Sequence, residues 1–356
     1  MTKMIFQGSK RHQIRSFVTL WRTVFGVLLR RAIGKPLVRE WPIDFEMGTL
    51  FIRRQFNHAF SLTDINEGRA YFDSLVTMAQ DVVEVDIVPS SAGEPKGDWF
   101  IPKGHSSALT MLYLHGGGYT FYLEVTKRWI ALLAQKLQMP IFAVDYRLTP
   151  EHAHPAQLED SLSAYRHLLE NGVKPSKLVV CGDSAGGHLL LMTLSKLAEH
   201  DLPQPALGIG ISPWTDIGQR GASQFGNDQY DMVQGYQTLK YGQWLKGNSA
   251  YSEQELSPID QDFSHCAPIY LQAGGKEILV DMIRDFAHMQ KEKGVAVRLD
   301  VWPHMTQEFH AYGDTLPQSR EAIQLLGQAI VWATSKDSVD DDVFQANSCT
   351  EVNALG

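Results

Sequence analysis

The chain has 356 residues but only three cysteines, and none of them belongs to a CxxC pair. So few isolated cysteines provide neither a disulfide framework nor a zinc site of the usual spacing. The histidines likewise show no HxxxH pattern near acidic residues, so we expect no metal and no cofactor. Scarce cysteine favours a reducing compartment, and a cytoplasmic protein is the natural expectation.

Long apolar runs are also missing, since no stretch reaches the 18 residues that a spanning helix requires. The segment 17–29 is apolar and follows basic residues, as the core of a signal peptide would. However, Arg22 interrupts it, and Arg30 and Arg31 follow where a small-residue cleavage site would stand. The sequence therefore predicts neither a transmembrane span nor a cleaved leader.

The chain carries no strong positive charge, because its formal net charge is −8. This balance argues against a general nucleic-acid binder. The charge is uneven, however: residues 1–54 contain 11 Lys/Arg and 3 Asp/Glu, a net of +8, and the remainder carries −16. A basic N-terminal segment on an acidic body indicates contact with an anionic surface, such as a membrane.

The basic N-terminal segment has the pattern of an amphipathic helix. Its apolar residues recur at helical spacing and form one stripe: Ile14, Phe17, Val18, Trp21, Val24, Phe25, Leu28 and Leu29. Two compatible interpretations follow: a cap helix that covers a binding site, or a helix that lies on a membrane surface.

Downstream of residue 82, strand patterns alternate with helix patterns. Strands are predicted at 82–89, 97–102, 108–115, 140–146, 178–183, 206–212, 269–274 and 297–302. Helices are predicted at 125–137, 157–169, 185–199, 238–245, 280–292 and 319–333. Such alternation predicts an α/β fold with a mostly parallel sheet and helices on both faces. We divide the chain into an N-terminal helical cap or membrane-surface segment (1–75), a catalytic domain (76–335) and a disordered acidic tail (336–356).

The strongest chemical signal is the sequence GDSAGG, residues 182–187, between a predicted strand and a predicted helix. A G-x-S-x-G motif in this setting raises its serine, here Ser184, on a sharp turn as a nucleophile. The glycines on either side allow the close backbone approach that the turn requires.

A second motif, HGGGY at 115–119, ends an earlier predicted strand. Hydrolysis of an ester passes through an oxyanion, which backbone N–H groups without bulky side chains can stabilise. Gly117 and Gly118 are expected to supply two such donors, and Ala185 a third.

HGGG, then DYRLTPEHAHPAQLED, then GDSAGG resemble the hormone-sensitive-lipase family of esterases, over about residues 108–333. The resemblance implies an α/β-hydrolase fold with an N-terminal helical cap, no cofactor, and hydrolysis of mostly short-chain carboxylic esters. It also casts Asp145, Tyr146, Arg147 and Pro150 as a structural brace beside the site. By residue type, Asp145 and Arg147 are suited to pair with each other.

The catalytic acid of this fold follows the serine in the chain and precedes the base. Glu277, in IYLQAGGKEILVD, matches the position where the resembled family carries its acid. Its work would be to orient the base and stabilise its charged form. Asp281 competes for the role but stands where a residue of a helical first turn is expected.

The position expected for the base holds no histidine. Aligned on Met305 and Phe309, the family's histidine falls on Gln307. An amide does not accept and return a proton near neutral pH, although it fills similar volume and makes similar hydrogen bonds. Three explanations stay open: an engineered inactive variant, a shifted loop in which His310 or His304 is the base, and a natural pseudoenzyme.

We therefore expect a serine carboxylic-ester hydrolase that works through an acyl-enzyme and is inactivated at Gln307. Tyr119, Phe121, Tyr122 and Trp214 are candidates for the substrate pocket. Competing hypotheses are a ligand-binding pseudoenzyme, a membrane-attached interaction protein and an amidase. The expected partners are a small-molecule ester and a membrane surface, with no nucleic acid, and a dimer is compatible with the sequence.

Overall fold

The computed structural model describes residues 3–78, 84–248, 250–335 and 350–351, and is built on a nine-stranded sheet. Its strands are β3 (Val85–Pro89), β4 (Gly97–Pro102), β5 (Thr110–Leu114), β6 (Ile141–Val144), β7 (Leu178–Asp183), β8 (Leu207–Ile211), β9 (Ile269–Gly274), β10 (Val297–Trp302) and β11 (Thr350–Glu351). They lie in the order β11-β10-β9-β8-β7-β5-β6-β4-β3. All neighbours from β6 to β11 pair parallel, whereas β4 pairs antiparallel with both β3 and β6. The predicted mostly parallel sheet is confirmed.

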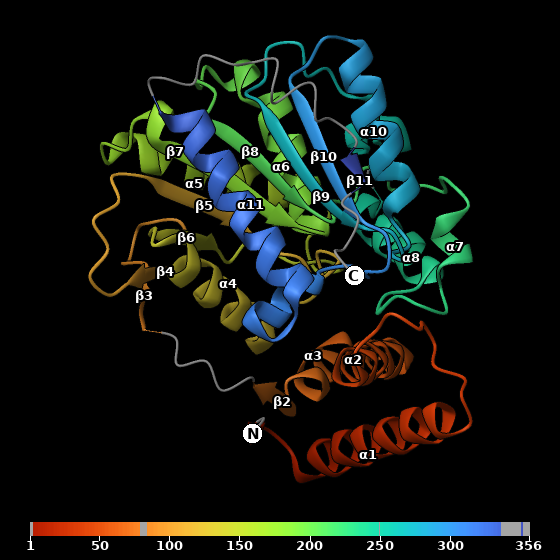
Figure 1. Cartoon of the computed structure of the whole chain (residues 1–356). Helices are drawn as coiled ribbons and strands as arrows, with labels where there is room; N and C mark the ends of the chain where they lie inside the picture. The colour runs from red at the N-terminus through yellow and green to blue at the C-terminus, as the bar shows by residue number, and fades with distance from the viewer. Residues whose placement is uncertain (1–2, 79–83, 249, 336–349, 352–356) are drawn as a thin grey trace.

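Helices cover both faces of this sheet (Figure 1). The longer ones are α4 (Glu124–Leu137), α5 (Ala156–Glu170), α6 (Ala185–Lys196), α8 (Gly235–Lys246), α10 (Val280–Glu292) and α11 (Pro317–Thr334). Short helices are α7 (Ser223–Gly226), α9 (Glu253–Leu256) and the 3-10 turns η1 (Pro175–Lys177), η2 (Ala198–His200), η3 (Pro258–Asp260) and η4 (Phe309–Thr315). One apolar core joins α4 and α11 to the sheet, and another joins α5, α6 and α10 to the opposite face.

The predicted element bounds agree with the structure to within a few residues. The helix expected at 280–292 is α10 with the same ends, and the one expected at 185–199 is divided into α6 and η2. The predicted disordered tail lies outside the described residues except for its residues 350 and 351, which form β11 beside β10.

The N-terminal segment contains α1 (Lys10–Ala32), α2 (Ile43–Ser61), α3 (Ile65–Phe72) and a two-stranded ribbon of β1 (Lys3–Phe6) and β2 (Leu75–Met78). The ribbon was not predicted. Figure 1 shows α1 as the outermost element, with α2 and α3 between it and the domain built on the sheet. Trp41 and Phe45 join the segment to that domain by packing with Trp302 and Phe309. No helix among the described residues is long and apolar enough to cross a membrane.

Candidate active site

Ser184 occupies a strained turn between β7 and α6. Its backbone has φ 50° and ψ −117°, a positive φ that non-glycine residues rarely adopt. The turn is possible because residue 186 has no side chain: a Cβ on Gly186 would lie 1.9 Å from the carbonyl oxygen of Leu114. The local sequence thus places Ser184 at the N-terminus of α6, where the helix dipole favours negative charge.

The three expected oxyanion donors border the same cavity as Ser184. Gly117 and Gly118 have φ values of +99° and +62°, so the chain turns sharply after β5. A Cβ on Gly118 would lie 2.3 Å from the ring of Tyr241, so the lack of a side chain there is a steric requirement. Ala185, the first residue of α6, completes the set. Their placement suits them to receive charge that develops beside Ser184.

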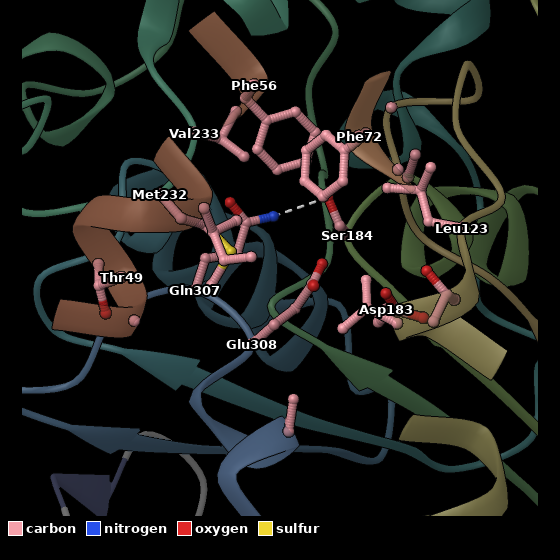
Figure 2. Close-up of a pocket in the computed structure, with 18 of the residues that line it drawn as sticks. Thr49, Phe56, Phe72, Leu123, Asp183, Ser184, Met232, Val233, Gln307 and Glu308 are labelled. Carbon is pink, nitrogen blue, oxygen red and sulfur yellow. Dashed lines mark hydrogen bonds between the residues drawn. The ribbon is translucent and has the colours of Figure 1, made fainter. Parts of the chain in front are cut away.

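Gln307 contacts the serine directly. Its Nε2 donates a hydrogen bond to Ser184 Oγ over 2.7 Å, as Figure 2 shows. The backbone N–H of Gln307 donates to Asp231 Oδ1 at 3.1 Å, which holds the loop in place. The side-chain oxygen of Gln307 is buried and has no hydrogen-bond partner among the described residues. The amide therefore sits where a base would have to be, but it offers the serine a donor and no proton acceptor.

Glu277 is fully buried behind this contact, just after β9. Its Oε2 accepts hydrogen bonds from Ser212 Oγ at 2.8 Å and from the Gly274 N–H at 2.7 Å. Burial, with repulsion from Asp231, raises the pKa of Glu277 to about 8. Its other oxygen, Oε1, has no partner among the described residues. The carboxyl group is thus held by one oxygen, and the second remains available to accept a hydrogen bond.

The competing acid, Asp281, has a structural task. It lies in the first turn of α10, where its Oδ2 accepts from the backbone N–H of Ser223 at 2.8 Å. Its side chain is one-third exposed and pairs with Arg284 at 3.9 Å. It does not border the Ser184 cavity.

Neither alternative histidine meets Ser184. His310 is buried among the rings of Trp129, Trp302 and Phe309 and shares a hydrogen bond with Gln272 Oε1 at 2.8 Å. Burial lowers the pKa of His310 to about 3. His304 is part-exposed, 3.9 Å from Glu40, and lies outside the cavity as well.

The cavity beside Ser184 has a volume of about 340 Å³. Its outer wall comes from the N-terminal segment, through apolar residues of α2 and α3: Phe51, Ile52, Phe56 and Phe72. The inner wall includes Trp214, Met232 and Val233 (Figure 2 labels the last two). No residue of α1 borders the cavity.

Of the four aromatic residues predicted to line the substrate pocket, three do not line it. Trp214 lines the cavity, but Tyr119, Phe121 and Tyr122 do not. Tyr119 takes a positive φ and turns inward, where its hydroxyl meets His188 Nδ1 at 2.6 Å. Phe121 packs against two phenylalanines of α2, and Tyr122 stacks on His115. These three side chains therefore pack around the glycine turn in the interior and do not face the cavity.

Asp145 and Arg147, which are suited by residue type to pair with each other, have other partners in the structure. Asp145 pairs with Lys96 at 2.7 Å, and Arg147 pairs with Glu159 and Asp160 at 2.8 Å each. Arg147 thereby ties the loop after β6 to the start of α5. The same loop reaches the glycine turn through Tyr146, whose hydroxyl donates to the carbonyl of His115.

Two acidic residues at the site were not predicted. Buried Asp231 accepts from the backbone N–H groups of Ile278 and Gln307, at 2.7 and 3.1 Å, and so links the loop after β9 to the loop after β10. Glu308 lies beside Ser184 in the cavity, and its carboxyl group shares a hydrogen bond with that of Asp183, which favours the protonated form of Glu308. No local motif marks either residue, because each gains its role from a distant part of the chain.

These carboxyl groups make the stability of the folded chain sensitive to pH. Burial raises the pKa of Asp231 to about 7 and that of Glu308 well above its usual range, in the latter case with repulsion from Asp183. Glu277, whose pKa is raised from 4.5 to about 8, sets the range of pH over which the effect is expected. The folded protein retains protons that the unfolded chain releases, so the free energy of unfolding should fall as pH rises from about 4.5 to 8. Each group contributes a slope of at most about 1.4 kcal/mol per pH unit.

Denaturant unfolding at several pH values tests this prediction. Glu308→Gln should flatten the fall, because the amide keeps the hydrogen bond to Asp183 without a proton to lose. Glu170→Gln, at the exposed end of α5, is the matched control and should leave the slope unchanged. Equal slopes in the unmodified chain and the Glu308 variant would contradict the assignment.

Comparison with known proteins agrees with the observed fold. The profile of the alpha/beta hydrolase fold family matches residues 111–311. The chain belongs to this family. It is 31% identical to an acetyl-hydrolase of Streptomyces hygroscopicus over 74% of the chain and 87% of the relative, and 26% identical to an esterase of Acinetobacter venetianus over 76% and 89%.

Solved structures place this α/β-hydrolase among esterases. A crystal structure of an esterase from the bacterial hormone-sensitive lipase family covers 92% of this chain and 100% of its own, with a TM-score of 0.69 and 25% identity. A double mutant of the esterase E40 covers 80% and 97%, with a TM-score of 0.72 and 28% identity. The resemblance to the hormone-sensitive-lipase family is confirmed.

Proposed function

We propose that this chain is a serine carboxylic-ester hydrolase for short- to medium-chain esters whose base position is occupied by Gln307. The observation that carries the proposal is the 2.7 Å hydrogen bond from Gln307 Nε2 to Ser184 Oγ. It puts residue 307 within reach of the nucleophile, which is the first requirement for a general base. With Gln307 at this position, the chain binds an ester and hydrolyses it very slowly.

With a histidine at position 307, the reaction is a two-step acyl transfer. The histidine takes the Ser184 proton, the serine oxygen attacks the ester carbonyl, and the N–H groups of Gly117, Gly118 and Ala185 stabilise the oxyanion. The C–O bond to the alcohol then breaks as the histidine returns the proton to the leaving oxygen. Water, deprotonated by the same group, attacks the acyl-enzyme and releases the acid and Ser184.

The cavity supports the choice of substrate class. Its volume of about 340 Å³ is at the small end of ligand pockets, and most of its wall from α2, α3 and Trp214 is apolar. An acyl or alcohol chain of modest length would therefore find apolar contacts, while the ester carbonyl lies against the glycine turn.

A ligand-binding pseudoenzyme is the second candidate, and the hydrogen bonding of Gln307 favours it. The amide gives the serine a fixed donor, and its own oxygen, which has no partner in the described part of the chain, could accept a hydrogen bond from a ligand. Such a protein would hold esters or related carbonyl compounds without turning them over, and Gln307 would be its native residue.

The unmodified chain should bind p-nitrophenyl butyrate saturably, as measured by quenching of tryptophan fluorescence. Its turnover should lie within about tenfold of that of Ser184→Ala, since losing one member of a catalytic triad costs nearly as much as losing all. Both rates would still exceed hydrolysis in buffer, because the oxyanion donors remain. Turnover a thousandfold above the Ser184→Ala control would contradict the proposal, because it would require a working base.

A further inference from the structure

Helix α1 turns its polar side inward. The side chains that it buries are His12, Ser16, Thr23 and Val27, of which three are polar. Ser16 Oγ meets Ser74 Oγ at 2.7 Å, and Thr23 Oγ1 accepts a hydrogen bond from Arg54 at 2.8 Å. A surface helix normally buries its apolar stripe instead. The orientation of α1 therefore comes from hydrogen bonds to α2 and to Ser74, the residue just before β2, and its apolar stripe is left outside.

The exposed face of α1 is a continuous apolar surface. Phe25, Ile14 and Trp21 are 68%, 65% and 56% exposed. The ring of Phe17 contacts those of Trp21 and Phe6, with centroids 6.0 and 6.2 Å apart, so the surface extends onto β1. We call this set the outer face; it comprises Met4, Phe6, Ile14, Phe17, Val18, Trp21, Phe25, Leu28, Leu29 and Ile33, each at least 38% exposed. A contiguous, exposed apolar surface of this kind marks a site of contact with another molecule or a membrane.

Cations border this outer face. Lys10, Arg11, Arg15 and Arg22 are exposed and lie on α1 itself, within a segment that carries a net +8. An amphipathic helix with aromatic and aliphatic residues on one side and basic residues beside them suits the interface of an anionic bilayer. A symmetric contact with a second copy would instead set these cations against one another.

We propose that the outer face docks on an anionic phospholipid membrane. The apolar side chains enter the boundary between headgroups and acyl chains, and the arginines meet the lipid phosphates. Helix α2 packs on α1 and also lines the Ser184 cavity, so α1 and α2 together, two helix layers of about 10 Å each, separate the docked lipid from that cavity. Esters dissolved in the membrane would then be concentrated on the side of the protein where α2 and α3 wall the pocket.

Flotation of the full chain with vesicles tests the proposal. Vesicles of phosphatidylcholine with about one third phosphatidylglycerol should bind the chain, and pure phosphatidylcholine vesicles should bind it much less. Arg15→Gln with Arg22→Gln should weaken binding by roughly fivefold per arginine. Trp21→Ser with Phe25→Ser should weaken it by at least about tenfold.

The matched control is Ile87→Ser with Val331→Ser, which removes apolar groups of similar exposure, 51% and 64%, from β3 and α11. It should bind as the unmodified chain does, and circular dichroism checks that every variant is folded. Equal binding by all variants, or no binding at low salt, would overturn the proposal. So would a dimer in lipid-free solution that Trp21→Ser with Phe25→Ser disperses, because a second copy would then cover the face. Vesicle binding needs no ester hydrolysis, so its outcome is independent of the esterase assay.

Discussion

Gln307→His should raise the turnover number for ester hydrolysis by several orders of magnitude, up to about 10⁶ if the remaining groups are in place. The imidazole would reach Ser184 from the position where the amide now lies 2.7 Å away. Unlike the amide, it can accept the serine proton and return it to the leaving alcohol. The increase is measured with p-nitrophenyl acetate and butyrate at neutral pH.

Adding Ser184→Ala to Gln307→His separates this mechanism from other effects of the new histidine. The double variant should return to the low rate of the unmodified chain, since an isolated imidazole lacks a nucleophile to activate. Retention of the high rate would mean that the histidine attacks or activates water by itself. No increase in the single variant would count against the esterase assignment and in favour of the pseudoenzyme.

The hydrolase domain was predictable because its signals are local. The longer strands and helices are indicated by the periodicity of their own apolar residues, and GDSAGG stands at a strand-to-helix junction that the neighbouring residues define. The contact between Gln307 and Ser184 was inferred from the family resemblance, and the structure brings those two residues together.

Features that depend on tertiary contact were not predictable. Periodicity showed that α1 is amphipathic, but which side is buried depends on Ser74 and Arg54, far along the chain. Asp231 similarly acquires its place only because the loops at 278 and 307 converge on it. Tyr119 follows the glycine turn and looks like a pocket residue, yet its positive φ turns it into the core.

Glu277→Gln, made in the Gln307→His background, should lower kcat by about 10³ to 10⁴. The carboxylate is buried, and one of its oxygens is fixed by Ser212 and Gly274, which leaves the other to accept a hydrogen bond from the imidazole. That bond would set the tautomer of the base and stabilise its charged form. The new donor would also lower the pKa of Glu277 from about 8, so that the group is ionised at neutral pH.

The matched control for Glu277→Gln is Asp281→Asn in the same background. Asp281 binds the backbone of Ser223 at the start of α10 and does not border the cavity, so its loss should change kcat by less than about threefold. Steady-state kinetics with p-nitrophenyl butyrate compares the two variants, and unfolding curves confirm that both are folded. If Asp281→Asn caused the large loss and Glu277→Gln the small one, the acid would be Asp281, and the buried carboxyl at 277 would serve only to bind the loop after β9.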